Sequence, residues 1–469
     1  MTNPDNDCGS HRGRIYSYQR IKELWKRRIP IPDVVSYHGD RSRLVVRNQL
    51  VVQLDSPLLN HEFALEGNDI RKNTPRRQVK VKIIGVCHCN PGLVLLEGTR
   101  GAKAHLLTGD MLIRYSPETD QPPPQVKSSS ANDVRYSPET DQPPPQVKTS
   151  SDGSGVPIDI VPASFDYQLR RILAGSASWS EFPIVAVMDT GIDFAYPNVE
   201  AIPIQHNGGH SMCGSIEPDY IGWDFVNDQN NPYDDNETNK HGTRIAAIIS
   251  SKMQHKVRIL PLKVIDSHGF GLLFNIFCGL EYVLSSRLRE KPSVVNASWG
   301  FYSETENSLL THYIKRLEAN KIWLINAAGN RGDIHRGQTV DLSLKPNTRF
   351  PACYTTRHAN VITVTTVNQN QSVRTGFEVT ENYSSTFVNI GVGSGNDGMF
   401  QEPLVTDRTR PPIKGSSYAT PYVSAFIAEG KRLPSDQLTR NELLQAIPGE
   451  TKINALGAFI ANGLIVPVE

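Results

Sequence analysis

Four residues of types that could cleave an amide bond stand at the ends of apolar segments of this chain. They are Asp189 in VMDTGID, His241 in HGTRIAA, Asn330 in INAAGN and Ser417 in GSSYATP. Serine attack on an amide needs a base for the hydroxyl proton, a carboxylate to orient that base, and donors for the developing oxyanion. The set therefore predicts acyl transfer with Ser417 as the nucleophile.

Each of these residues also has a purely structural interpretation. Serine is common at a helix start, where its hydroxyl accepts an orphan backbone N–H. Asp189 with the following threonine and glycine is also typical of a turn that ends a strand, and His241 can simply begin a helix. Their joint occurrence in one order, each at an element boundary, favours the catalytic interpretation.

The elements that would position these residues alternate along the chain. The hydrophobic pattern predicts strands at 183–189, 257–265, 293–299, 322–329 and 360–367, and helices at 241–251, 272–288, 308–321 and 415–431. This alternation predicts an α/β fold with a parallel sheet covered by helices on both faces. Chemistry in such sheets lies beyond the carboxyl ends of the strands, where the polar segments stand.

Three segments, IVAVMDTGID, HGTRIAAII and GSSYATPYVSA, resemble the signatures of the subtilisin-like serine proteases, the subtilases. The resemblance implies a peptidase domain at about 158–469. It implies that Asp189 orients the base, that His241 is the general acid and base, and that Ser417 is the nucleophile. It also implies that Asn330 supplies the oxyanion hole together with the Ser417 backbone N–H. Tyr418 stands where the family usually has methionine.

The resemblance also implies a substrate cleft with two edges. Gly269, Phe270 and Gly271 are expected to pair with the backbone of a bound peptide as an added strand. Ser298, Trp299 and Gly300 are expected at the opposite edge, with the aromatic ring of Trp299 narrowing the pocket.

Catalysis of this kind requires no cofactor, but a structural calcium ion is one expectation for the segment before His241. Asp224 and Asp228 are the first candidates for ligands, with Asp234 and Asp235 nearby in sequence. Carboxylates suit this hard cation. The alternative is a solvated acidic loop.

Residues 1–113 are predicted to form a small α+β domain with strands at 43–54, 79–89 and 92–98 and a helix at 18–28. Residues 1–114 hold 19 Lys and Arg against 11 Asp and Glu, a balance of +8, and the rest holds 30 against 37, a balance of −7. Opposite charge favours docking of this domain on the peptidase domain. No aromatic-rich motif indicates nucleic-acid binding. Two interpretations stay open: a propeptide-like inhibitor or an unrelated regulatory domain.

A duplicated segment separates the two domains. RYSPETDQPPPQVK occurs at Arg114–Lys127 and again at Arg135–Lys148. Its proline, serine and acidic residues predict a disordered linker at 114–157, because such a composition cannot build a core. A docking site for a proline-binding module is the alternative.

The remaining features bear on location and on the class of protein. We expect a cytoplasmic protein, because no apolar run of signal-peptide or membrane-spanning length occurs and the six irregularly spaced cysteines favour free thiols. The CHC segment at Cys87–Cys89 hints at a metal, but alternation along a strand explains it better. The main hypothesis is an intracellular serine endopeptidase acting on a protein or peptide, with no membrane partner. The alternative is a catalytically silent subtilase-like scaffold that binds peptides.

Overall fold

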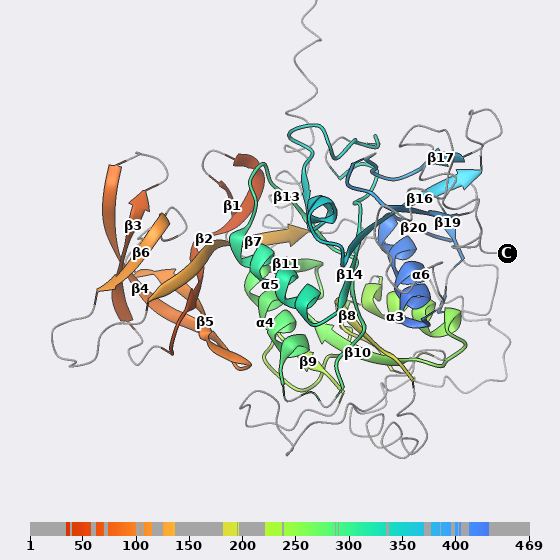
Figure 1. Cartoon of the computed structure of the whole chain (residues 1–469), viewed down its shortest axis with the longest axis horizontal. Helices are drawn as coiled ribbons and strands as arrows, with labels where there is room; N and C mark the ends of the chain where they lie inside the picture. Colours follow the sequence, from red (N-terminus) through yellow and green to blue (C-terminus); the bar gives the residue numbers. More distant parts are fainter. Residues whose placement is uncertain are drawn as a thin grey trace, which may run out of the picture.

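The computed structural model describes the chain in two parts, an N-terminal sheet and a larger α/β part (Figure 1). The described residues are 34–37, 40–57, 62–69, 74–99, 104, 107–114, 125–136, 182–194, 196, 221–236, 239–286, 288, 290–333, 337–369, 377–384, 386–394, 399–401, 403–404 and 412–430. The helix predicted at 18–28 lies outside them. No helix within these ranges combines the length and apolarity that crossing a membrane requires.

The α/β part is built on one eight-stranded sheet with the order β17-β16-β14-β12-β8-β10-β9 and β18 beside β16. The strands are β8 (Ile184–Asp189), β9 (Trp223–Asp224), β10 (Arg258–Lys263), β12 (Val294–Ala297), β14 (Trp323–Ala327), β16 (Val361–Gln369), β17 (Phe377–Val379) and β18 (Ile390–Gly393). Only β17 pairs antiparallel with its neighbour; the other pairings in this sheet are parallel. The predicted parallel α/β sheet is confirmed.

Helices cover both faces of this sheet because its central strands are apolar on both sides. Helices α3 (His241–Lys252) and α6 (Ser416–Ala428) pack on one face, and α4 (Leu273–Leu284) and α5 (Ser308–Ala319) pack on the other (Figure 1). In β8, Val185 and Val187 join the core under α3 and α6, whereas Ala186 and Met188 join the core under α4 and α5. The carboxyl ends of β8, β12 and β14 consequently meet at one edge of the sheet.

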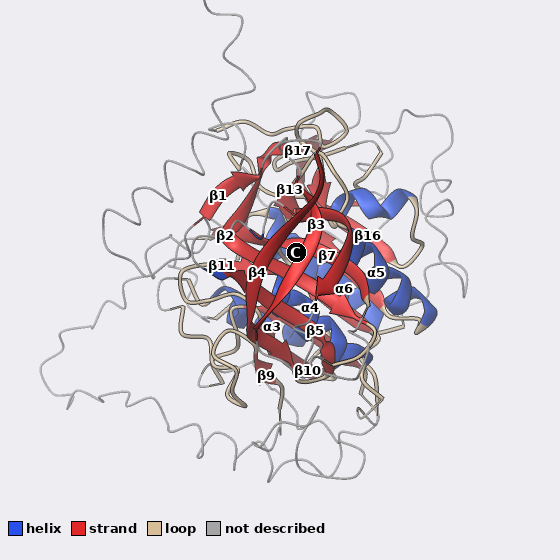
Figure 2. Cartoon of the chain, turned by 90° about the vertical axis from the view of Figure 1, so that its left-hand side faces the viewer, coloured by secondary structure: helices blue, strands red, loops and turns tan. Residues whose placement is uncertain are grey.

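The N-terminal part is a second sheet, in which β7 lies between β2 and a short strand of the α/β part, β11. Its strands are β1 (Val34–Tyr37), β2 (Asp40–Leu54), β3 (Glu62–Asp69), β4 (Thr74–Cys87), β5 (Asn90–Gly98), β6 (Leu107–Arg114), β7 (Val126–Tyr136) and β11 (Phe270–Leu272). Figure 2 shows these strands crossing in front of the helical layer. The three strands predicted in this region correspond to β2, β4 and β5.

Strand β7 corrects the prediction of a disordered linker over the whole of 114–157. It includes the end of the first repeat, the spacer between the repeats and the first two residues of the second repeat. The polar sequence VKSSSANDVRY does not predict a strand. It becomes one because the edges of β2 and β11 offer backbone partners on both of its sides.

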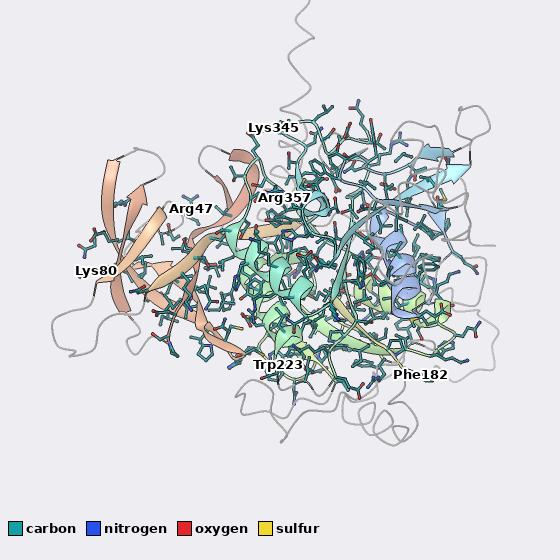
Figure 3. The ribbon with its side chains drawn as sticks, in the orientation of Figure 1. Arg47, Lys80, Phe182, Trp223, Lys345 and Arg357 are labelled. Atoms are coloured by element: carbon teal, nitrogen blue, oxygen red, sulfur yellow. The ribbon has the colours of Figure 1, made fainter. Side chains whose placement is uncertain are left out.

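Alternation along the strands gives the N-terminal sheet two buried faces. Leu50, Val52 and Leu96 belong to a core within this part of the chain, whereas Val51 and Leu95 belong to the core that includes Leu273 and Phe277 of α4. The buried core inside the N-terminal part is formed by Leu50, Val52, Leu54, Leu65, Val79, Val81, Val94, Leu96 and Ala104. One face of the sheet therefore packs directly on the α/β part, and Lys80 lies at the end of the sheet that is far from that part (Figure 3).

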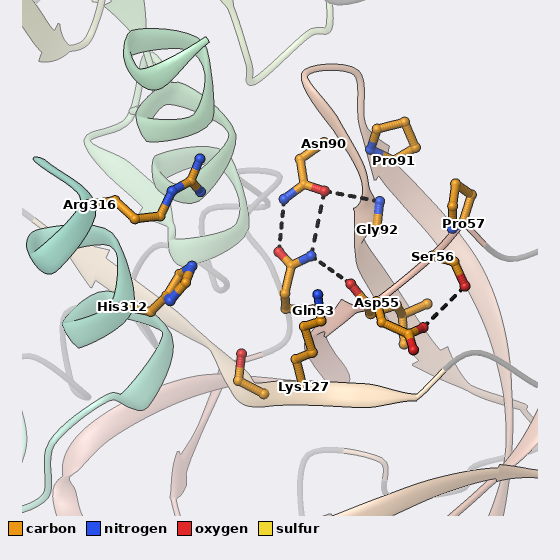
Figure 4. A pocket seen from close by; sticks show the side chains of 12 residues that line it. Gln53, Asp55, Ser56, Pro57, Asn90, Pro91, Gly92, Lys127, His312 and Arg316 are labelled. Carbon is orange, nitrogen blue, oxygen red and sulfur yellow. Dashed lines mark hydrogen bonds between the residues drawn. The ribbon is translucent and has the colours of Figure 1, made fainter. Parts of the chain in front are cut away.

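Polar contacts fix the same seam around the buried carboxylate of Glu281 on α4. It accepts hydrogen bonds from Asn90 of β5 at 2.8 Å, from the Tyr313 hydroxyl at 2.9 Å and from Arg316 at 3.0 Å. Burial and the nearby Glu281 charge raise the pKa of Tyr313, so its hydroxyl stays a donor. Figure 4 shows Asn90 and Gln53 opposite Arg316 and His312, beside a cavity of about 540 Å³.

The cysteines differ in part from the prediction of free thiols. Cys87, Cys278 and Cys353 are free and buried. Cys89 is disulfide-bonded, and its partner lies outside the described residues. His88 lies against Asp228 at 2.9 Å, and no metal-binding group of three His, Cys, Asp or Glu occurs among the residues described.

The adjacent residues Leu95 and Leu96 test whether the two faces of the N-terminal sheet are separate cores. Leu96→Ala should lower the free energy of unfolding of the sheet by about 2–5 kcal/mol, because it opens a cavity in the internal core. Leu95→Ala should instead raise amide hydrogen exchange in α4 while the strands stay protected. Amide hydrogen exchange measured by mass spectrometry on the full chain shows which segments each variant destabilises. The same pattern of exchange in both variants would contradict the division into two cores.

Candidate active site

Asp189 ends β8 at the carboxyl edge of the main sheet. Its side chain is fully buried, and one carboxylate oxygen, Oδ1, accepts the backbone N–H of Thr190 at 2.8 Å. The other oxygen, Oδ2, is buried and has no hydrogen-bond partner among the described residues. Burying a carboxylate oxygen without a donor is unfavourable, so the hydrogen bonds to Oδ1 have to stabilise this group.

His241, the first residue of α3, faces this carboxylate. Its Nδ1 lies 2.7 Å from Asp189 Oδ1, and its side chain is 1% exposed. The hydrogen bond requires the proton on Nδ1, which leaves Nε2, on the far side of the ring, to act as an acceptor. Gly242 permits this approach, since a Cβ there would lie 2.2 Å from the Gly191 carbonyl oxygen.

The residue before His241 holds the start of α3 in place. Lys240 has left-handed backbone angles, φ 51° and ψ 47°, which are uncommon for a side chain of this type. Its ammonium group contacts Asp193 at 3.1 Å, the Tyr233 hydroxyl at 3.2 Å and the Asp234 carbonyl oxygen at 2.7 Å. Burial opposes the charge, but the carboxylates of Asp193 and Asp234 outweigh it and raise the pKa of Lys240.

Ser417 is the second residue of α6, directly after Gly415 and Ser416. Its hydroxyl donates to the Ser298 carbonyl oxygen at 3.3 Å, and the Ser298 hydroxyl donates to the Ser417 carbonyl oxygen at 2.9 Å. Gly415 has φ 131°, so the chain turns sharply into the helix. The backbone N–H groups of this first helical turn lie at the positive end of the helix dipole.

Asn330 follows β14 and is fixed at both ends. Its side-chain oxygen accepts the Ser416 backbone N–H at 2.7 Å and the Ser416 hydroxyl at 2.9 Å. Its own backbone N–H donates to Asp333 at 2.8 Å. Because the amide oxygen is held by Ser416, the amide N–H₂ group is turned away from that contact and is presented beside the start of α6.

A buried network behind Asn330 was not predicted from the sequence. Tyr302 donates to Asp333 at 3.1 Å and accepts from Asn382 at 2.9 Å, and the guanidinium of Arg349 contacts the Ala327 carbonyl oxygen. Burial, followed by the Asp333 charge, raises the pKa of Tyr302 well above its usual value. No local sequence signal marks these residues, because their contacts join segments far apart in the chain.

The predicted substrate-binding residues fall on two separate segments. Gly269, with φ 84°, leads into β11, where Phe270 and Gly271 pair antiparallel with Tyr136 and Arg135 of β7. β11 is close to the catalytic candidates, since Ile265 forms a bridge with Gly271 and donates its backbone N–H to the Asp189 carbonyl oxygen.

The second segment is Ser298, Trp299 and Gly300. Trp299 is 1% exposed and belongs to the core between the sheets, so its indole does not line an open pocket as the sequence suggested. A Cβ at Gly300 would lie 2.4 Å from the guanidinium of Arg349, which explains the glycine.

The acidic residues before His241 each have protein partners, and calcium binding there stays a prediction. Asp224 accepts from Val226 and Asn227, Asp228 contacts His88, Asp234 accepts from Thr243, and Asp235 contacts Lys263. Within the described residues these carboxylates are engaged by protein donors in different directions. Burial raises the pKa of Asp234, which also disfavours the charged ligand that calcium needs.

Comparisons with known proteins show the family of this chain. A model of the Subtilase family matches residues 181–454. Subtilisin-like protease 1 of Plasmodium vivax is 25% identical over 283 residues, which are 56% of this chain and 42% of that protein. The thermophilic serine proteinase of Bacillus sp. (strain AK1) is 27% identical over 292 residues, 60% of this chain and 59% of that protein. The chain thus spans less than two thirds of the length of these relatives.

Among solved structures, a cold adapted subtilisin-like serine proteinase matches with a TM-score of 0.38 and 20% identity, covering 58% of this chain and 84% of that one.

Replacement of Lys240 tests how the start of α3 is held. Lys240→Met should lower the free energy of unfolding by about 1–3 kcal/mol, because the charged hydrogen bonds are lost. The pKa of Lys240 is raised, so its contribution is complete below the unfolded value of 10.5 and is lost only above it. Denaturant unfolding of both proteins should therefore show a constant difference from about pH 7 to 9. A difference that narrows across this range would contradict the assignment.

Proposed function

The chain belongs to the subtilase family, and from that membership we propose that it is a serine endopeptidase that cleaves peptide bonds through an acyl-enzyme. The observation that carries the proposal is the buried hydrogen bond between His241 and Asp189, at 2.7 Å, next to the helix that begins at Ser416 and Ser417. This pair supplies a base held at Nδ1, so that Nε2 can accept the hydroxyl proton of a serine nucleophile.

In the proposed mechanism Ser417 attacks the carbonyl carbon of the substrate while His241 takes its hydroxyl proton. Asp189 keeps the proton of the neutral ring on Nδ1 and stabilises the imidazolium that forms. His241 then gives its proton to the leaving amine, and water, activated by the same base, hydrolyses the ester on Ser417. Support for this step comes from the 2.7 Å hydrogen bond between His241 Nδ1 and Asp189 Oδ1.

The oxyanion of the tetrahedral intermediate is proposed to lie between Asn330 and the Ser417 backbone N–H. Support comes from the two hydrogen bonds from Ser416 to the Asn330 side-chain oxygen, which orient the amide N–H₂ group before substrate arrives. Asp333 holds the Asn330 backbone from the other side. Donors that are fixed in advance need no reorganisation during the reaction, and removal of one typically lowers kcat by about 10²–10³.

The proposed substrate is an extended peptide that adds to β11 as a strand, with Gly269, Phe270 and Gly271 along one side of it. Ser298, Trp299 and Gly300 are proposed to form the other side. The support is that β11 already accepts a strand in this structure, since residues Val134–Tyr136 of β7 pair with Phe270–Leu272.

We propose that the N-terminal part regulates the enzyme in cis by the same contact. As long as Val134–Tyr136 occupies β11, a substrate strand cannot use that edge. The apolar contacts of Leu93 and Leu95, together with the Asn90–Glu281 hydrogen bond, keep the N-terminal sheet in position. Cleavage in the part of 114–157 that follows β7 would separate the sheet from the peptidase part while leaving it available to bind again.

We also propose that the protein is cytoplasmic. The buried free thiols of Cys87, Cys278 and Cys353 support this compartment, whereas the disulfide bond of Cys89 is more typical of an oxidising environment.

Covalent labelling by a fluorophosphonate tests the activity. Wild-type protein should react at Ser417, before or after limited trypsin treatment that releases the N-terminal part, and Ser417→Ala should not react. Ser416→Ala is the matched neighbour: it should label more slowly, because it weakens the orientation of Asn330, but to the same final extent. Absence of labelling in the wild type under every condition would favour a silent peptide-binding scaffold instead.

Terminal sequencing of the purified chain tests the proposed processing. The wild type should acquire a new N-terminus within 114–157, and Ser417→Ala should remain intact when purified alone. Adding a small amount of wild type to Ser417→Ala then shows whether the cut can also occur between molecules. A wild type that stays intact and has full activity would contradict regulation by cleavage.

A further inference from the structure

Tyr418, the residue after the nucleophile, lies between the two helices that carry the proposed catalytic residues. It belongs to α6, is 2% exposed, and packs in the core that α3 and α6 share. Its ring centroid lies 5.3 Å from that of His241, with the two planes at 50°. The side chain next to Ser417 in sequence is therefore in direct contact with the base that would activate Ser417.

The hydroxyl of Tyr418 makes a second contact, to the segment that precedes His241. It donates to the side-chain oxygen of Asn239 at 3.1 Å, and Asn239 is 2% exposed. The Asn239 backbone N–H in turn donates to Asn236 at 2.9 Å. Between Asn239 and His241 stands Lys240 with its left-handed backbone, so this hydrogen bond holds the strained segment from which α3 starts.

From these two contacts we infer that Tyr418 is a positioning residue, which sets the imidazole of His241 relative to Ser417. The inference rests on the proposed peptidase function. It adds Tyr418, which takes no part in the proposed chemical steps and acts through His241. Asp189 holds the His241 ring at Nδ1, and a single hydrogen bond permits rotation about its own axis. The Tyr418 ring against the imidazole limits this rotation, and the Asn239 hydrogen bond limits movement of the backbone below it.

A role confined to filling the core makes a different prediction from a positioning role. Removal of the hydroxyl alone leaves the aromatic ring and its packing, so a purely structural residue would change only the stability of the protein. A positioning residue would change the rate of the chemical step while substrate binding stays the same. The hydroxyl and Asn239 should also act as one unit, because they are the two ends of one hydrogen bond.

The test uses the activated full-length enzyme and a peptide substrate. Tyr418→Phe should lower kcat by about 3- to 10-fold, with KM within about twofold of the wild type, as expected for one lost hydrogen bond. Asn239→Leu should have a similar effect, and the double variant should be no worse than the more impaired single one. Tyr422→Phe is the matched control on the same helix, since its ring stacks on Phe400 at 5.4 Å, and it should keep wild-type kcat.

A spectroscopic measurement separates this inference from the proposed function. In the Ser417→Ala background, which needs no activity, the proton on His241 Nδ1 should shift or broaden in the proton NMR spectrum when Tyr418 is changed to Phe or Met. The Tyr422→Phe change should leave it in place. An unchanged resonance, or kcat values that follow only the fraction of folded protein, would overturn the positioning role even if the enzyme is an active peptidase.

Discussion

The hydrogen bond between Asp189 and His241 is the contact on which the rest of the structure depends. Burial of a carboxylate is unfavourable unless it is paired, and here one oxygen is left without a protein donor among the described residues. The surroundings have to hold the pair against that cost. Gly242 lets α3 start against the turn after β8, and the contacts of Lys240 fix the segment before it. The end of β8 and the start of α3 are therefore held so that the His241 ring keeps one orientation.

The sequence could predict this centre because its parts are local patterns with a common spatial consequence. A buried strand that ends in Asp189 and helices that begin at His241 and at Ser417 each have a short apolar signal. In a parallel sheet these boundaries necessarily meet at one edge, so three local signals predict one site. The calcium expectation stays a prediction. The acidic residues around Asp224 and Asp228 form a local sequence pattern, but their hydrogen-bond partners, such as His88 for Asp228, come from distant segments of the chain.

Other features could not be predicted because their cause lies far away in the chain. Strand β7 has few β-branched or aromatic residues, and it is a strand because β2 and β11 present unpaired backbone groups to it. Trp299 was expected to form a pocket wall, but its indole belongs to a core that also includes residues of the N-terminal sheet. No local sequence pattern predicts a role for Tyr418. The inferred role depends on its hydrogen bond to Asn239, which only the structure shows.

The two pairings of β7 differ in a way that suits regulation. β7 pairs with β2 at six positions between Val45 and Leu54, but with β11 only at the three residues Val134–Tyr136. Ser130, in the middle of β7, accepts a hydrogen bond from Asn307 of the α/β part at 2.7 Å. Detachment from β11 therefore breaks only the end of the strand, while its first half keeps its place in the N-terminal sheet. The proposed substrate-binding edge of β11 is therefore freed by a local opening, whose free energy is smaller than that of unfolding the sheet.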